Sequence, residues 1–402
     1  MSRLTIVRAG SIRAVATFFA LTAFAVLAGC NSTGIGGRNG PDVRSAPVTG
    51  TTIGSGPEKV ALLLPLSATG NAGQIALTMK NSADLALRDF KTAGLTILVK
   101  DDSGTPDGAR AAASQAISEG AELILGPLFA RSVTAVAAVA RSANVPVIAF
   151  STDTSTAAPG VYLLSFLPQS DVDRIIGFAA ARGKRSFAAL LPNNIYGNVV
   201  AAELQRIVAN VGGRVMASET YDLDKQAMQQ PATAVAALIK SGTVDAVFMP
   251  DAGDAAPFLA QILAANGVKP GSIAYLGSGQ WDDARVASES NLAGAWFPGP
   301  DSAGYNSFAK RYQAAFNSAP FRADTLVYDA TSLAAGLAAR FGDKRFATQT
   351  LTNANGFIGV DGAFRFLQNG LNQRGLAVYQ VKGGQSVMID PAPKTFAKAP
   401  GT

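Results

Sequence analysis

The sequence predicts an α/β protein with two doubly wound, Rossmann-like lobes. From Lys59 onward, short apolar runs alternate with longer helical patterns, which is typical of βα units around a parallel sheet. Several short runs are apolar throughout, as expected for strands that helices cover on both faces. Two series of such units follow one another along the chain, so we expect two sheets.

The expected strands form two groups and a β-rich end. The first group is 60–64, 95–100, 122–125 and 145–150, and the second is 187–191, 214–219, 246–249 and 273–276. Turn signals at Asp361-Gly362, Asn369-Gly370 and Gly383-Gly384 delimit three more strands, over 363–367, 376–381 and 386–389.

Helical patterns lie between the strands. In 74–90, for example, Ile75, Met79, Ala83 and Leu87 recur at intervals of four residues, and we expect this stripe to face a sheet. The other expected helices are 108–118, 132–143, 169–181, 197–211, 226–240, 255–265, 307–316 and 323–340.

The N-terminal region predicts an export signal. Three arginines precede an apolar stretch, 14–28, that is too short to span a membrane, and Leu27-Ala28-Gly29-Cys30 ends it. This pattern resembles the bacterial lipobox, in which the cysteine is acylated. We therefore expect residues 1–29 to be removed and a lipid on Cys30 to anchor the chain to a membrane. A buried free thiol is the alternative for Cys30.

The segment 30–57 predicts a flexible tether, because it has almost no apolar bulk and many Gly, Ser, Thr and Pro residues. Asn31, rather than the aspartate associated with retention in the inner membrane, follows Cys30. We therefore expect the protein in the periplasm, on the inner leaflet of the outer membrane.

Composition indicates a folded globular protein. The signal's removal leaves 373 of 402 residues, more than one core usually supports, which favours two domains. Apolar residues make up 48% of the chain and charged residues 15%, and Cys30 is the only cysteine, so no intramolecular disulfide is possible. The net charge of +6 falls to +3 without the signal. With no cluster of Lys and Arg, we expect no nucleic-acid partner.

Residues directly after the expected strands are the candidate ligand contacts, since such sheets bind ligands at the carboxyl ends of their strands. Hydroxyls, amides, aromatic rings and carboxylates gather there, which indicates recognition by hydrogen bonds. The candidates are Ser67, Arg131, Ser132, Ser151, Thr152, Asp153, Tyr196, Asp251 and Trp281.

Most candidates also have a structural interpretation. Arg131 could be a solvated residue in the first turn of a helix. Ser151, Thr152 and Asp153 could cap the following segment. Tyr196 could pack between the lobes.

The order of the strand-end motifs resembles the type I periplasmic binding proteins, the group that contains the branched-chain amino-acid (leucine-binding) receptors. The motifs are VALLLPLSATG, DDSGTPDGARAA, ILGPL, VPVIAFS, LLPNNIYG, ETYD, DAVFMPDAGD and GVDGAFRFLQNG, and the likeness runs over residues 59–390. Within the group, VPVIAFSTDTSTAAPG, RGKRSFAALLPNNIYG and the lipobox most resemble the LppC/LpoA-type lipoproteins, which activate penicillin-binding proteins.

The resemblance implies two lobes joined by a three-crossing hinge. Residues 58–165 plus 300–345 would form lobe 1, residues 166–299 plus 346–392 would form lobe 2, and residues 393–402 would be a tail. Closure of the lobes around a cleft is the motion that such a hinge implies.

Two functions follow from the resemblance. The first is activation of a penicillin-binding protein, and so regulation of peptidoglycan synthesis. The alternative is a solute-binding receptor that delivers an amino acid or a similar small polar ligand to an ABC permease. Against the alternative, Leu128, Phe129 and Ala130 occupy the place where amino-acid receptors have small hydroxyl residues; the adjacent Arg131 and Ser132 could hold a carboxylate instead.

The residues do not favour an enzyme. The chain has no histidine, which removes the commonest general base, the Ser-His-Asp triad and histidine-based zinc sites. Ser307 and Lys310 match S-x-x-K, but Lys394-Thr395 is followed by Phe396 instead of glycine, and S-D-N does not occur. We expect no cofactor and no metal site.

Overall fold

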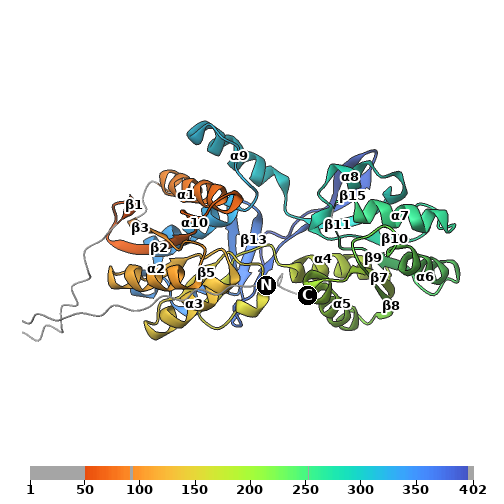
Figure 1. The fold of residues 1–402 in the computed structure, drawn as a ribbon, viewed down its shortest axis with the longest axis horizontal. Coiled ribbons are helices and arrows are strands. Elements are labelled where there is room, and N and C mark those ends of the chain that lie inside the picture. The colour runs from red at the N-terminus through yellow and green to blue at the C-terminus, as the bar shows by residue number, and fades with distance from the viewer. Residues whose placement is uncertain (1–49, 91–93, 252, 397–402) are drawn as a thin grey trace, which may run out of the picture. The chain divides into compact units, whose positions relative to one another are not determined.

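The structure, a computed structural model, describes residues 50–90, 94–251 and 253–396. The predicted signal, Cys30 and the tether up to residue 49 lie outside these ranges, so the lipid anchor stays a prediction. In the described part, each of two lobes has its own sheet (Figure 1). No helix there is long and apolar enough to cross a bilayer.

The sheet of the first lobe has six strands in the order β1-β3-β2-β4-β5-β6. Its parallel strands are β2 (Glu58–Leu64), β3 (Leu95–Asp101), β4 (Leu123–Leu125), β5 (Val147–Ala149) and β6 (Val161–Leu163), and β1 (Thr51–Gly54) pairs with β3 in the antiparallel sense. Helices cover both faces, as the apolar strands predict.

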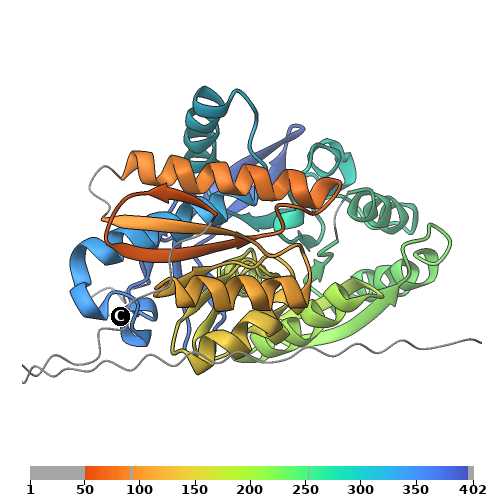
Figure 2. The same cartoon turned by 60° about the vertical axis from the view of Figure 1, so that its left-hand side comes forward.

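Alternate residues of β2 face the two helical layers. Val60, Leu62 and Leu64 pack with α1 (Asn71–Asp89) and α10 (Asp324–Phe341), and α1 runs along this face of the sheet (Figure 2). Ala61 and Leu63 pack on the other face with α2 (Pro106–Ser118) and α3 (Ala130–Ser142). All five side chains are fully buried.

The sheet of the second lobe has seven strands in the order β16-β15-β11-β10-β9-β7-β8. Its parallel strands are β7 (Ser186–Pro192), β8 (Arg214–Tyr221), β9 (Ala246–Phe248), β10 (Ala274–Leu276) and β11 (Trp296–Gly299). The antiparallel hairpin β15 (Ala377–Lys382) and β16 (Gln385–Asp390) extends the sheet. The helices α4 (Pro168–Ala181) and α5 (Ile195–Asn210) cover one face, and α6 (Gln229–Lys240), α7 (Ala255–Ala265) and α8 (Ala284–Ser288) cover the other.

A small antiparallel sheet completes the first lobe. It consists of β12 (Phe357–Gly359), β13 (Gly362–Phe366) and β14 (Asn372–Arg374). The helices α9 (Ser302–Phe316) and α11 (Thr348–Leu351) lie before it in the chain, as do the short 3₁₀ turns Thr154–Thr156, Gly279–Trp281, Ser290–Leu292 and Gly342–Lys344. Phe364 and Phe366 are buried in the core that β2 and α1 share.

The chain passes between the lobes at residues 164–167, 300–301 and 375–376, which we call the hinge. Hydrogen bonds tie the first and third crossings together. The Asn372 side-chain amide donates to the carbonyls of Leu163 and Ser165, each over 2.8 Å, and Arg174 Nε of α4 donates to the Leu376 carbonyl over 2.6 Å. The α/β class with two doubly wound lobes is confirmed.

Two of the predicted boundaries were wrong. Residues 346–374, assigned by resemblance to lobe 2, belong to the first lobe, because Phe346, Leu351, Phe364 and Phe366 are buried in its core. The predicted tether extended to residue 57, but residues 51–54 form β1, which gains backbone hydrogen bonds along the edge of β3.

The first residues of the predicted tail, up to residue 396, pack against the first lobe. The Pro393 carbonyl lies so close to Gly375 that a Cβ there would be 2.7 Å away, and a Cβ on Gly356 would be 2.8 Å from the Phe396 ring. The guanidinium of Arg365 lies 4.8 Å from the centre of that ring. Residues 391–396 therefore return from β16 to the small sheet, a fourth passage between the lobes in addition to the three crossings of the hinge.

Candidate functional site

A cavity of about 500 Å³ lies at the hinge and is lined by residues of both lobes. We call it the hinge cavity. Its lining comes from the crossings and their flanks (Phe166, Leu167, Pro168, Pro300, Arg374, Leu376), from the second lobe (Ser170, Asp171, Tyr196, Gly279, Gln280, Asp282) and from the first lobe (Tyr305, Arg322). Aromatic and aliphatic surface is thus combined with a few charged groups, as in most small-molecule sites.

Asp171 is the carboxylate that the first turns of α4 bring to the cavity. Pro168 starts this helix, where its fixed φ is suited and its missing N–H is not needed. The Asp171 side chain accepts a hydrogen bond of 2.9 Å from the Gly279 amide. Burial raises the pKa of Asp171 to about 7. Within the described residues, no Lys or Arg forms an ion pair with it.

Tyr196 forms part of the second-lobe wall. It lies in the first turn of α5, which Asn194 caps by accepting a 2.9 Å hydrogen bond from the Gly197 amide. The Tyr196 hydroxyl donates to the Pro250 carbonyl over 3.3 Å. Burial raises the pKa of Tyr196, so the phenol stays neutral at physiological pH.

Arg374 ends β14 and is a buried cation, with 4% of its surface exposed. Its Nε donates to the Ser165 carbonyl over 3.1 Å, and its guanidinium lies 4.5 Å from the centre of the Phe166 ring. Among the described protein atoms, Nη1 and Nη2 have no hydrogen-bond partner. Burial lowers the pKa of Arg374.

Arg322 is a second cation at the cavity, just before α10. Its Nη2 donates to Asp361 Oδ1 over 2.5 Å, and its guanidinium lies 4.5 Å from the centre of the Tyr305 ring. Asp361 is fully buried and also accepts a 2.5 Å hydrogen bond from Thr325.

Asp329 of α10 lies behind these cations. Its Oδ1 accepts a 2.7 Å hydrogen bond from the Val360 amide, whereas Oδ2 has no partner in the described part of the chain. Burial raises the pKa of Asp329 to about 7. Residue 359 must be glycine for this packing, since a Cβ there would be 2.1 Å from Asp329 Oδ2.

Tyr196 alone of the residues predicted as ligand contacts lines the hinge cavity. Ser67 is exposed after β2, where its amide donates to Asp101 Oδ1 over 3.2 Å. Arg131 is exposed in the first turn of α3, and Ser132 is fully buried with no hydrogen-bond partner for its hydroxyl among the described residues.

The segment after β5 forms a local turn. Ser151 is buried, and its Oγ accepts a 3.1 Å hydrogen bond from the Asp153 amide. Asp153 accepts a 3.0 Å hydrogen bond from the Ser155 amide at the start of a 3₁₀ turn, so the predicted capping role is confirmed for Asp153. Thr152 is exposed.

Trp281 was wrong as a ligand contact, because its side chain is fully buried in the second-lobe core. Its indole N–H donates to the Asp251 carbonyl over 3.1 Å, and a Cβ on Gly277 would be 2.1 Å from its ring. The Asp251 carboxylate accepts a 3.1 Å hydrogen bond from Tyr221 and lines a different cavity, on the second lobe.

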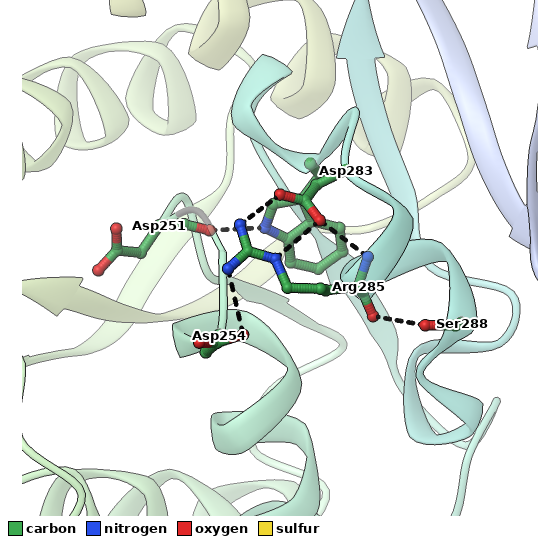
Figure 3. A network of polar contacts seen from close by, with 6 residues as sticks. Asp251, Asp254, Asp283, Arg285 and Ser288 are labelled. Carbon is green, nitrogen blue, oxygen red and sulfur yellow. Dashed lines mark hydrogen bonds and ion pairs between the residues drawn. The ribbon is translucent and has the colours of Figure 1, made fainter.

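A polar network connects Asp254, Asp283 and Arg285 near the Asp251 carbonyl (Figure 3). Arg285 pairs with Asp283 over 2.7 Å and with Asp254 over 3.3 Å, and Asp283 also accepts from the Arg285 amide over 2.8 Å. All three side chains belong to the second lobe, and none lines the hinge cavity. We interpret the network as a cap that fixes the start of α8.

Sequence reasoning missed Asp171, Arg322 and Arg374. They flank the hinge, whereas the prediction considered only residues that follow strands. A weak signal existed for Asp171, which directly follows the uncharged run SFLPQS. In the described residues, no group of three or more His, Cys, Asp or Glu could hold a metal ion.

Comparison with known proteins identifies the family. The family model described as periplasmic binding protein matches residues 57–385. A putative branched-chain amino acid ABC transporter from Rhodospirillum rubrum is similar in structure, with a TM-score of 0.72 and 18% identity over 83% of this chain and 99% of that one. A solute-binding protein of an ABC transporter from R. palustris, in complex with benzoate, has a TM-score of 0.54 and 21% identity over 85% of this chain and 98% of that one.

A curated relative adds a partial match. An uncharacterised protein of Rickettsia prowazekii is 22% identical over 174 residues, 43% of this chain and 45% of the relative, so the chain spans about half the length of that protein. The matched family consists of binding proteins rather than enzymes. With two lobes of mixed, mainly parallel sheets and a family match over most of its length, this chain belongs to the periplasmic binding protein family and has the type I fold.

Proposed function

We propose that this protein is a periplasmic solute-binding receptor that holds a small organic solute in the hinge cavity and delivers it to an ABC permease. The observation that carries the proposal is the cavity itself, since residues of both lobes and the crossings line it. A volume of about 500 Å³ lies in the range of sites for small molecules, and its lining combines aromatic rings with a few polar groups.

A solute in this position would couple binding to the arrangement of the lobes. A ligand shifts a conformational equilibrium only by as much as it binds one state better than the other. Contacts to Tyr305 on the first lobe and Tyr196 on the second would give a solute that preference. A permease that reads the arrangement of the lobes could then distinguish loaded from empty receptor.

The relatives narrow the solute class. One solved relative binds benzoate and another is described as a branched-chain amino acid transporter, so small carboxylic acids are the solutes to test first. Calorimetry of the purified full-length protein with amino acids and aromatic acids should give one site per chain, with micromolar affinity or better. Failure of every acid to bind, together with no co-purifying solute in native mass spectrometry, would contradict the receptor function.

Regulation of peptidoglycan synthesis is the second candidate. It depends on the likeness of the motifs to the LppC/LpoA-type activators and on the predicted lipid at Cys30, which would place the protein on the inner leaflet of the outer membrane. The cavity and the solved relatives favour the receptor. If this protein captures a detergent-solubilised penicillin-binding protein and binds no solute, the activator function would be favoured over the receptor function.

A further inference from the structure

The hinge cavity has cations on its first-lobe side. Arg322 and Arg374 both line it, and each guanidinium packs on an aromatic ring that also lines it, Tyr305 for Arg322 and Phe166 for Arg374. Such packing holds a planar guanidinium in place before a ligand arrives.

The neighbouring carboxylates, Asp361 and Asp329, do not satisfy all the guanidinium N–H donors of the two arginines. Asp361 uses Oδ1 for Arg322 and Oδ2 for Thr325. Asp329 gives Arg374 no hydrogen bond, and burial raises the pKa of Asp329 to about 7, so at neutral pH it carries only part of a negative charge. The terminal nitrogens of Arg374 are buried with no protein acceptor in the described part of the chain. Burying these N–H donors without an acceptor costs free energy, which a ligand that accepts their hydrogen bonds would recover.

The second-lobe side offers the opposite chemistry. Asp171 lines the cavity and accepts one hydrogen bond from the Gly279 amide, so its remaining acceptor capacity can serve a donor on a ligand. Tyr196, on the same side, already donates its hydroxyl hydrogen to Pro250 and can accept another hydrogen bond.

The strand ends of the first lobe are poor anchors for an anion. Ser151 uses its Oγ within its own turn, and Leu128, where related receptors have hydroxyl residues by resemblance, packs against the core. Neither residue lines the hinge cavity.

We propose that the hinge, instead of the strand ends of the first lobe, anchors the carboxylic acid of the proposed function, with its carboxylate against Arg322 and Arg374 and a hydrogen-bond donor at its other end against Asp171. The inference rests on the proposed receptor function. Its ligand class covers amino acids, whose donor is an ammonium, and hydroxylated aromatic acids, whose donor is a phenol. Apolar surface from Leu376 and Pro300 would contact the body of the solute between its two polar ends.

Matched ligand pairs test the carboxylate without changing the protein. We would measure the affinity of the full-length protein for leucine and leucinamide, and for 4-hydroxybenzoate and 4-hydroxybenzamide. Replacing the carboxylate of the binding acid by an amide should weaken binding at least about 30-fold, since charge-assisted hydrogen bonds are lost. Benzoate should bind more weakly than 4-hydroxybenzoate, because it has no donor for Asp171.

A conservative variant tests the anchor. Arg322→Lys keeps the charge beside Asp361 but loses the forked geometry, and it should weaken binding of the acid about tenfold or more. Arg311→Lys is the matched control, because Arg311 also pairs with an aspartate (Asp89, 3.5 Å) and packs on a tyrosine (Tyr328, 5.5 Å) but does not line the cavity. Its affinity should equal that of the unchanged protein.

The outcomes separate this inference from the receptor function. If the unchanged protein binds none of the ligands, the receptor function fails. If it binds an acid and its amide equally well, or if Ser151→Ala with Thr152→Ala abolishes binding while Arg322→Lys does not weaken it, the receptor function stands and the hinge anchor is wrong. Loss of binding in Arg322→Lys counts only when its thermal unfolding matches that of Arg311→Lys; otherwise the ligand pairs decide.

Discussion

Replacing Asp171 by Asn should stabilise the ligand-free protein, and more so as the pH rises. Burial raises the pKa of Asp171 from 3.8 to about 7 in the folded protein, whereas the unfolded chain keeps the ordinary value. Between these two values the folded state binds more protons than the unfolded state, so the stability that this group contributes falls with rising pH. The Asn side chain does not ionise, and its carbonyl oxygen can still accept the hydrogen bond from the Gly279 amide.

The size of the effect follows from the shift. A difference of about 3 pKa units between the folded and unfolded states lowers the free energy of unfolding by at most about 4 kcal/mol at a pH above 7. Residue 171 keeps some exposed surface, lines a cavity and accepts one hydrogen bond, so solvent screens part of this cost. We therefore expect Asp171→Asn to raise the free energy of unfolding by about 1–2 kcal/mol at pH 8 and by close to zero at pH 4.

Urea unfolding of both proteins at pH 4, 6 and 8 measures this difference. Asp282→Asn is the control, because Asp282 also lines the cavity but is exposed and should show little pH-dependent gain. A constant difference between pH 4 and pH 8, or a loss of stability at pH 8, would refute the assignment of Asp171 as an unpaired buried carboxylate. The same variant should bind the acid more weakly, so stability and ligand affinity should change in opposite directions.

Three further predictions concern other parts of the chain. Trp281→Ala should lower the free energy of unfolding by about 3–5 kcal/mol, because it empties a core position; unchanged stability with lost ligand binding would instead make Trp281 a ligand contact. Phe396→Ala should leave the core intact but make residues 391–396 more susceptible to limited proteolysis, since the ring no longer packs on Gly356 and Arg365; an unchanged cleavage rate would contradict the return crossing. Cys30→Ser should move the protein from the membrane fraction to the soluble periplasmic fraction, and mass spectrometry that finds no lipid on Cys30 in the unchanged protein would rule out the anchor.

Most strands and helices of the two main sheets could be predicted from the sequence because burial leaves a local pattern of apolar residues. A strand segment covered on both faces is apolar throughout, as residues 60–64 of β2 are, and a helix on a sheet repeats apolar residues every three or four positions, as α1 does. The strands that the prediction missed are too short for such a pattern to stand out. These five strands, β1, β6, β11, β12 and β14, have only three or four residues each, and β1 consists of the mostly polar TTIG.

Lobe membership of the segment before the last crossing needed long-range information. Residues 357–374 alternate like any hairpin, and nothing in their pattern says which core they join. Phe364 and Phe366 place this segment in the first lobe, because they pack with β2 and α1, almost 300 residues earlier in the chain. Such contacts follow from the tertiary fold rather than from local propensity.

The hinge cavity could not be predicted from the residues that follow strands, because it also depends on contacts between distant segments of the chain. Residues that follow strands include Tyr196, which lines the cavity, but not Arg322, Arg374 and Asp171. Those three residues meet because the crossings bring together segments about 150 and 200 residues apart, and Arg374 becomes a buried cation only when Phe166 and Phe364 pack around it. Arginine is usually solvated, but through the crossings Arg374 becomes a buried cation whose terminal nitrogens have no acceptor among the described residues.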